Sequence, residues 1–444
     1  MSTHAHTDRD MPSREELVRL TSKPMPRWVT TVSTLFAVIG AVVFLIGAFT
    51  NQDRVWQALH FNWLFFASVS QAGVIVVAVQ RITTARWSRT IVRLIEGYVA
   101  FLPVALVLLV LIMLGGSHIF PWFSGQAPIV EKQFWLSRGF FVSREIGMFL
   151  ILTVLSIWYI YKCVRLDVGL LPNDSGAAWA KGIRDRMRRG FGEERREIHS
   201  THSMQGRLAV VLCLLFNFFY LMHSWDLSMS LDMFFQSTMY GWWFYMGAWL
   251  AALMSWSLLV MWWRKHLAAD DLITEHHFHD LGKLGFAFTA FWGYLTFAQY
   301  LVIWYGNMPE ETHWFHGRLE APWEWATLAI VFLVFVIPFF GLLSRAAKVY
   351  LPTFFLFALS SVVGIWLLRY IEVYPSLHSD SPHFLFGIWE IGITLGFLGL
   401  WGLSYRAFMD AFPRLRVTMM TSPYRDEVQV PVNPETMEPL PAHE

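Results

Sequence analysis

Residues 92–114 read VRLIEGYVAFLPVALVLLVLIML and contain only two charged side chains, Arg93 and Glu96. A run of about 20 apolar residues is long enough to cross a hydrocarbon core roughly 30 Å thick. A charged side chain inside that core costs at least about 2.5–3.5 kcal/mol on insertion scales. The stretch therefore predicts a membrane-spanning helix, and it raises the question of what Glu96 does near the start of it.

The composition of the whole chain agrees with a membrane protein. Of its 444 residues, 55% are hydrophobic, 17% aromatic and 15% charged, whereas a soluble domain has about 25% charged residues. A net charge of +1 gives no reason to expect nucleic acid as a partner. The polar residues 1–27 lack the pattern of a cleaved signal peptide, so the first span is expected to insert by itself.

Nine further stretches resemble the first in length and hydropathy, which predicts an all-α polytopic membrane protein with ten transmembrane helices. The predicted spans are residues 28–49, 58–80, 91–114, 140–162, 207–225, 238–262, 284–305, 324–344, 350–371 and 384–405.

Positive charge is distributed unevenly between the two sides of these spans. If the N-terminus is cytoplasmic, only six of the 34 Lys and Arg residues lie outside, so that 28 lie inside. An excess of Lys and Arg marks the cytoplasmic side of a membrane protein. We therefore predict a multi-pass protein of the bacterial cytoplasmic (inner) membrane with both termini in the cytoplasm. The six outside are Arg54, Lys132, Arg138, Arg144, Arg318 and Arg369.

A weak internal duplication is visible in the spans. FNWLFFASVSQAGVIVVAVQRI (61–82) resembles GWWFYMGAWLAALMSWSLLVMWW (241–263), and the spans that follow are also alike in character. Parallel repeats of this kind occur in membrane transporters. We predict two four-helix bundles, spans 2–5 and 6–9, with two flanking helices. The corresponding divisions are a cytoplasmic N-terminal segment 1–27, a flanking span 28–57, a first bundle 58–225 with a cytoplasmic loop 163–206, a second bundle 226–371, a flanking span 372–405 and a cytoplasmic C-terminal tail 406–444.

Two segments outside the spans have a distinct character. WAKGIRDRMRRGFGEERREIHSTH (179–202) is interpreted either as an amphipathic surface helix near lipid headgroups or as a solvated basic loop. The tail after Pro413, which ends in PVNPETMEPLPAHE, is expected to be extended chain that could lie on a partner.

Polar side chains in or next to the spans form two belts, and such residues are first candidates for function. The inner belt consists of Glu96, Arg93 and Lys283. The outer belt consists of His60, Asn62, Glu145, His223, Asp226, Gln236, Tyr240, Gln299, Tyr300, Arg369, Glu372 and Glu390.

The outer belt supports two kinds of chemistry. His60 and Asn62 are candidates for hydrogen bonds to a quinone, with Gln299 and Tyr300 as further quinone-binding candidates, although the first two could simply meet water at the interface. His223 and Asp226 lie three residues apart, so the carboxylate could orient the imidazole for a proton relay; an ordinary helix-end pair is the alternative.

No residue pattern predicts a metal or haem centre. Cys163 and Cys213 are too few for an iron–sulfur cluster, and no CxxCH motif is present. The histidines of TEHHFHD (274–280) and HWFH (313–316) lack the HExxH spacing, and solvated loops are expected there. We expect this chain to bind neither metal nor haem.

Three stretches resemble a known family: FWGYLTFAQYLVIWYGNMPEET (291–312), NWLFFASVSQAGVIVVAVQRITTARWSR (62–89) and RLIEGYVAFLP (93–103). They are similar to the ActF family of NrfD-like membrane subunits of bacterial alternative complex III, a quinol:cytochrome c oxidoreductase. The resemblance extends over roughly residues 28 to 415.

The resemblance implies a place in a respiratory electron transport complex. Quinol, such as menaquinol, would be oxidised near the periplasmic face, and electrons would pass to iron–sulfur and multihaem cytochrome c subunits. An ActC-like sister subunit would hold the quinol pocket, which argues against a redox role for His60 and Asn62. Small membrane subunits and lipids would be further partners, and ActF-like subunits would carry part of a proton path.

Three functions are therefore weighed. The leading one is a non-redox subunit that conducts protons, with Glu96 as an entry group, Lys283 as its neighbour, and Asp226, Glu372 or Glu390 at the exit. Glu96 could instead only pair with Arg93 at the interface. The other two functions are a structural anchor for periplasmic redox subunits and a free-standing transporter, which the absence of Gly/Pro-broken span pairs disfavours. Quinone binding by the chain itself remains an alternative.

Overall fold

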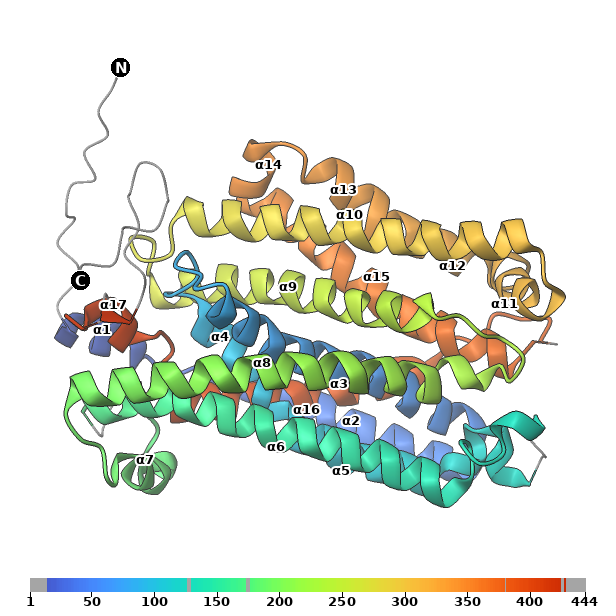
Figure 1. Ribbon diagram of the computed structural model, residues 1–444, viewed down its shortest axis with the longest axis horizontal. Coiled ribbons are helices and arrows are strands. Elements are labelled where there is room, and N and C mark those ends of the chain that lie inside the picture. The colour runs from blue at the N-terminus through green and yellow to red at the C-terminus, as the bar shows by residue number, and fades with distance from the viewer. Residues whose placement is uncertain (1–13, 126–128, 173–175, 380, 425–426, 429–444) are drawn as a thin grey trace.

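The computed structural model describes residues 14–125, 129–172, 176–379, 381–424 and 427–428. Over these residues the chain is α-helical without β-strands, and ten helices are long and apolar enough to cross a membrane. They run side by side along the long axis of the molecule (Figure 1). The predicted all-α polytopic membrane fold is confirmed.

Each predicted span overlaps one of these helices. The spans are α2 (Arg27–Thr50), α3 (Gln52–Ile82), α4 to α5 (Val92–Leu114), α6 (Arg138–Leu170), α8 (Glu194–Leu227), α9 (Met239–Leu267), α10 (Glu275–Gly306), α12 to α13 (Glu324–Gly341), α15 (Leu351–Leu377) and α16 (Ile388–Ala411). The shorter helices are α1 (Arg14–Thr21), α7 (Lys181–Arg188), α11 (Pro309–Leu319), α14 (Arg345–Val349) and α17 (Val417–Thr421).

Two spans are interrupted by other helical geometry. A 3₁₀ turn, Gly97–Phe101, joins α4 (Val92–Glu96) to α5 (Leu102–Leu114). A π-helical stretch, Val331–Val336, joins α12 (Glu324–Ile330) to α13 (Ile337–Gly341). Single 3₁₀ turns occupy Gly116–His118, Pro121–Ser124, Val130–Lys132, Ala178–Ala180 and Met229–Leu231.

Several helices extend beyond the apolar stretches that predicted them. The predicted loop 163–206 is shorter in the structure, because α6 continues to Leu170 and α8 already begins at Glu194. A hydropathy pattern ends where charged residues begin, whereas the i to i−4 hydrogen bonds of a helix continue through polar residues.

Helix α3 is the core of the molecule. Every residue from Gln57 to Ala78 is buried, and α3 packs against α5, α8, α9, α15 and α16. A helix that is apolar on all sides belongs in the interior. Because α3 contacts helices from both predicted halves, the grouping of spans 2–5 and 6–9 into two bundles stays a prediction.

The two predicted flanking spans pack tightly against each other. A Cβ atom added to Gly40 of α2 would lie 2.2 Å from the Cα atom of Gly396 in α16. Small residues at such a contact allow two membrane helices to approach closely. On its other side α2 exposes large apolar residues such as Leu35, Leu45 and Phe49, as expected for a face in contact with lipid.

The bundle has two ends, named here after the helices found there. The α17 end carries α1 and α17, which contact each other, and α7; the α11 end carries α11 (Figure 1). Within the segment 179–202, residues 181–188 form the short helix α7, with Met187 buried and Ile183 exposed, and residues 194–202 begin α8. Contact of this segment with lipid headgroups stays a prediction.

The expectation of an extended chain after Pro413 is wrong for residues 417–421, which form α17. Val417 is buried there, and Met420 is 5% exposed, because both pack against apolar residues of the same chain. The PVNPETMEPLPAHE sequence at 431–444 lies outside the described residues, as do residues 1–13 of the polar segment 1–27.

Candidate functional site

A cluster of buried charged residues joins α6 and α8 at the α11 end. The Arg144 guanidinium donates from Nε and Nη2 to Asp226 Oδ2, at 3.0 and 2.8 Å. Trp135 Nε1 donates to the other oxygen of Asp226 at 2.6 Å, and the Arg144 guanidinium lies 3.9 Å from the Trp135 ring centroid. Glu145 is fully buried, and its Oε1 is 3.6 Å from Arg144 Nε. We call these residues, together with His223, the outer cluster.

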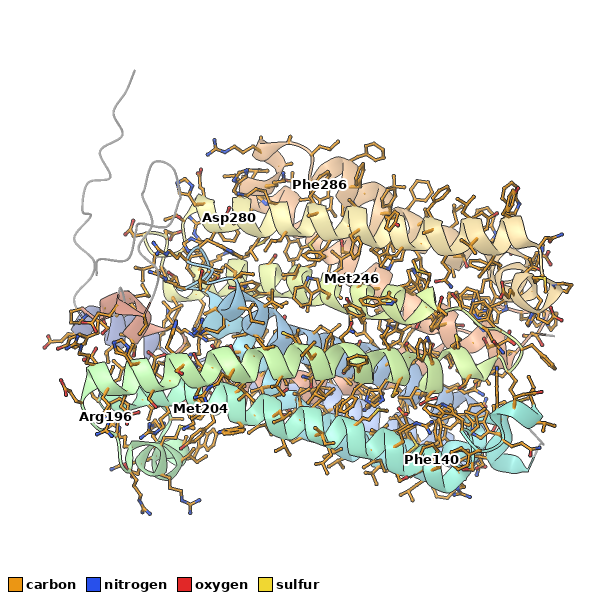
Figure 2. The ribbon with its side chains drawn as sticks, viewed as in Figure 1. Phe140, Arg196, Met204, Met246, Asp280 and Phe286 are labelled. Atoms are coloured by element: carbon orange, nitrogen blue, oxygen red, sulfur yellow. The ribbon has the colours of Figure 1, made fainter. Side chains whose placement is uncertain are left out.

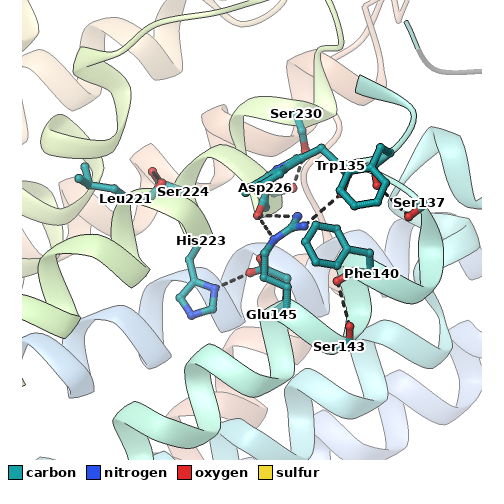
Figure 3. Close-up of polar contacts among 12 residues, drawn as sticks. Trp135, Ser137, Phe140, Ser143, Glu145, Leu221, His223, Ser224, Asp226 and Ser230 are labelled. Carbon is teal, nitrogen blue, oxygen red and sulfur yellow. Dashed lines mark hydrogen bonds and ion pairs between the residues drawn. The ribbon is translucent and has the colours of Figure 1, made fainter. Parts of the chain in front are cut away.

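Glu145, and not Asp226, orients the His223 imidazole. The Nδ1 atom of His223 is hydrogen-bonded to Glu145 Oε2 (Figure 3). The expected pairing of His223 with Asp226 is therefore wrong, because Asp226 is already bound by Arg144 and Trp135. The second ring nitrogen, Nε2, is buried and makes no hydrogen bond.

The local sequence explains this arrangement. Helices α6 and α8 pack against each other, and α6 supplies the adjacent residues Arg144 and Glu145. On α8, His223 and Asp226 are three residues apart, which places them on one helix face. The imidazole and the guanidinium therefore each meet one carboxylate from the opposite helix.

A cavity of about 630 Å³ borders the outer cluster. Asp226 and Trp135 form part of its lining, together with Trp225 and Gln299. Two lining atoms are buried without a hydrogen-bond partner, Gln299 Oε1 and Trp225 Nε1. The volume lies within the range of about 300–1,000 Å³ that is typical of small-molecule sites.

A second cluster of charged residues lies at the α17 end, around Glu96. Arg93 Nη1 donates to Glu96 Oε2 at 2.5 Å, and Arg93 Nη2 is paired with Asp167 Oδ2. Arg416 Nη2 is paired with the other oxygen of Glu96. Arg93 and Glu96 have no exposed surface. We call Arg93, Glu96, Asp167 and Arg416 the inner cluster.

The charges of the inner cluster balance, with two guanidinium groups facing two carboxylates. Burial alone would lower the pKa of Arg416, but the Glu96 carboxylate raises that pKa above its usual value. The predicted neighbour Lys283 is not part of the cluster. Its side chain is 55% exposed and pairs with Asp280 at 2.6 Å.

The other predicted exit carboxylates are held in separate ion pairs at the α11 end. Arg369 Nη1 donates to both oxygens of Glu372, at 2.6 and 2.7 Å. The Glu390 carboxylate accepts hydrogen bonds from Arg54 Nη2 and from the Tyr374 hydroxyl, each at 2.7 Å. Each carboxylate therefore has its own cation, and neither is part of the outer cluster.

The four predicted quinone-binding residues do not form one site. His60 Nε2 donates to the Leu227 carbonyl at 2.7 Å, and the Asn62 side-chain oxygen accepts from Trp366 and Thr394. Both residues are fully buried, so they do not meet water at the interface. Gln299 and Tyr300 are neighbours in the sequence but face different surroundings. Gln299 lines the cavity, whereas Tyr300 is 38% exposed on the outside of α10.

Further polar side chains lie along α3 between the two clusters. Gln71 Nε2 donates to Ser156 Oγ at 2.8 Å, and Gln71 Oε1 is buried without a partner. Trp401 Nε1 donates to Ser70 Oγ at 3.1 Å. At 1.5 Å per residue, Gln71 lies about 13 Å along the helix from Asn62. Polar groups thus occur at intermediate depth as well as at both ends.

In the part of the chain that the structure describes, no group of three or more His, Cys, Asp or Glu residues is placed to hold a metal ion. A comparison of the chain with protein-family models and with curated proteins found no match. The function is therefore inferred from the residues themselves.

Sequence reasoning missed several partners of the predicted residues. The Arg144–Glu145 doublet lies within the predicted span 140–162, so the presence of two adjacent charges there was a usable signal. Asp167 lies just beyond that span and Arg416 lies in the tail, where charged residues are ordinary. Neither position carries a sequence signal that would have connected it with Glu96.

Proposed function

We propose that this chain is a proton-conducting membrane subunit of a quinol oxidoreductase. The observation that carries the proposal is the His223 imidazole, which has Glu145 on one nitrogen and no partner on the other. An imidazole can accept a proton on one nitrogen and release one from the other. Glu145 fixes the orientation of the ring. Arg144 lies next to both Glu145 and Asp226, and Asp226 lines the cavity.

The location of the two clusters supports the same proposal. They lie at opposite ends of the bundle, and the polar side chains of α3 lie between them. Buried charges inside a membrane protein are costly and mark proton or ion pathways by default. The resemblance to NrfD-like subunits of alternative complex III supports a place beside an ActC-like subunit, with iron–sulfur and cytochrome c partners performing the electron transfer.

The charge distribution supports an orientation. With 28 of 34 Lys and Arg residues on one side of the spans, the α17 end would face the cytoplasm. The inner cluster would then take up protons from the cytoplasm of the bacterial cell. The outer cluster and its cavity would face the periplasm, where the protons would be released.

Replacing Glu145 by Gln tests the proposal directly. The substitution keeps the size of the side chain but removes the base that accepts from His223 Nδ1. In proteoliposomes that contain the assembled complex, we expect several-fold fewer protons translocated per electron. An external pH indicator, read during quinol oxidation, provides the measurement.

The control is Glu311→Gln, which changes a carboxylate that lines the same cavity outside the outer cluster. It should leave the proton-to-electron ratio unchanged. A Glu145→Gln complex with a wild-type ratio would remove the outer cluster from the proton path.

The cavity favours a second candidate function, which is quinone binding by this chain. Gln299 Oε1 needs a donor and Trp225 Nε1 needs an acceptor. A quinol hydroxyl supplies both, and the Trp135 and Trp225 rings provide apolar lining. Menaquinol is the ligand that the resemblance favours.

For this second function, Gln299→Leu should raise the KM for quinol by about fivefold with kcat unchanged, because one lost hydrogen bond is worth about 1 kcal/mol. Steady-state kinetics with a short-chain quinol provide the measurement. Tyr300→Phe is the matched control, since Tyr300 is the adjacent residue on the exposed side of α10. Equal KM values for both variants would assign quinol binding to another subunit.

A further inference from the structure

The segment that follows α16 folds back over the α17 end of the bundle. Val417 and Met420 pack in a small apolar cluster with one leucine of α1 and one that follows α6. The backbone N–H of Thr418 donates to Asp167 Oδ1 at 2.7 Å. Residues 415–422, which we call the strap, therefore lie directly on the inner cluster.

A cavity of about 70 Å³, lined by both apolar and polar residues, lies beneath the strap. Its lining includes Cys163, Asp167 and Arg416. Three of the lining groups are buried and make no hydrogen bond: the Thr418 hydroxyl, Gln80 Nε2 and Arg416 Nε. Water molecules settle where buried polar groups lack partners, and a cavity of this volume is large enough to hold water.

The underside of the strap differs from its outer contact. The outer contact is apolar, whereas the underside presents polar groups to the cavity and an arginine to Glu96. A segment that served only to anchor the tail would gain most from an apolar underside, because unpartnered buried polar groups are unfavourable. The polar underside is instead suited to contact with water.

We infer that the strap closes a water-holding chamber, and that Arg416 is the latch through its ion pair with Glu96. Glu96 is fully buried and Cys163 is 4% exposed when the latch is in place. Release of Arg416 would connect both with solution and would let Glu96 exchange a proton with chamber water. This role in proton uptake rests on the proposed function, whereas the closure itself does not.

Arg416 is suited to act as a latch because of its position. Its side chain is 19% exposed, while its partner has no exposed surface. A long side chain at the edge of the membrane can move its charged end into water without crossing the apolar core. Arg93, the other cation on Glu96, is fully buried and also holds Asp167, so it cannot leave in the same way.

The reactivity of Cys163 tests the closure. In a Cys213→Ser background, Cys163 is the only thiol of the chain, since the sequence contains two cysteines. The solubilised, assembled complex is treated with a small charged methanethiosulfonate, and the mass of this chain is followed in time. We expect slow labelling with the native strap and labelling at least about tenfold faster in Arg416→Ala, because the rate follows the population of the open state.

Two variants distinguish the latch from a general loosening of this end. Arg416→Lys keeps the cation and should restore most of the protection. Arg406→Ala removes an arginine that pairs with Asp410 at the same end, and it should label like the native complex.

Glu96→Gln removes the other half of the latch and provides a second route if Arg416→Ala does not assemble. It should accelerate labelling to a similar extent. Slow labelling of Cys163 in both Arg416→Ala and Glu96→Gln would contradict the proposal that the strap closes the chamber. Rapid labelling of the native complex would contradict it as well. Neither result depends on proton translocation, so the experiment can disprove the closure without disproving the proposed function.

Discussion

Replacing Arg93 by methionine is expected to destabilise the protein by about 3–5 kcal/mol, the usual effect of removing one partner from a buried ion pair. Arg93 has no exposed surface and binds two carboxylates, Glu96 and Asp167. Methionine has a similar length but no charge. After the substitution Glu96 still has Arg416, whereas Asp167 loses its arginine and keeps the N–H of Thr418. The uncompensated charge is therefore that of Asp167.

A second substitution at Asp167 is expected to rescue the first. Asp167→Asn removes the uncompensated charge and keeps an oxygen that can accept from Thr418. The Arg93→Met/Asp167→Asn double variant should therefore recover most of the lost stability. The apparent melting temperature of the purified complex, measured for both single variants and the double variant, gives the coupling between the two positions.

The control is Arg195→Met, which breaks an exposed ion pair with Glu427. Because water screens such a pair, the melting temperature of the Arg195→Met complex should stay near that of the native complex. An Arg93→Met variant that is as stable as Arg195→Met would show that the inner cluster does not hold α4 and α6 together.

The spans could be predicted from the sequence because a membrane imposes one simple requirement. Each helix needs about 20 apolar residues, and this requirement is local in the chain. The run from Val92 to Leu114, 23 residues long, satisfies it without reference to any other residue. Helix ends were less accurate where charged residues continue a helix, as in α8, whose first residues are Glu194, Arg195 and Arg196.

The partners of the polar residues could not be predicted, because they are far apart in the sequence. Glu96 and Arg416 are 320 positions apart and meet only through the packing of the tail on the bundle. The spacing of Arg93 and Glu96 predicted one ion pair correctly, because i, i+3 residues lie on one helix face. The same rule failed for His223 and Asp226, since each found a stronger partner on α6.

The structure also changes what Glu96 would have to do. The sequence places it near the start of its span, as an entry group for protons or as the partner of Arg93 at the interface. In the structure it is fully buried and holds two ion pairs. A protonated acid no longer attracts a guanidinium, so proton uptake at Glu96 requires the loss of at least one pair. The more exposed of its two cations, Arg416, is the one that can leave.

Glu96→Gln is expected to reduce the protons translocated per electron by at least about tenfold, because a positioned acid–base group contributes about 10²–10⁴-fold to proton transfer. Glutamine has nearly the same shape as glutamate and can still accept a hydrogen bond from Arg93, and Arg93 keeps its pair with Asp167. The complex should therefore assemble and oxidise quinol. The measurement is proton release and electron transfer in the same proteoliposomes.

The matched control is Asp280→Asn, a carboxylate at the same end that pairs with Lys283 outside the inner cluster. It should keep the native proton-to-electron ratio, so that a lower ratio in Glu96→Gln cannot be attributed to a general loss of negative charge at this end. If Glu96→Gln and Asp280→Asn translocate protons equally well, Glu96 serves only to hold α4 against the tail. The proton path would then have to enter elsewhere, and the inner cluster would be an ion-pair network whose only role is structural.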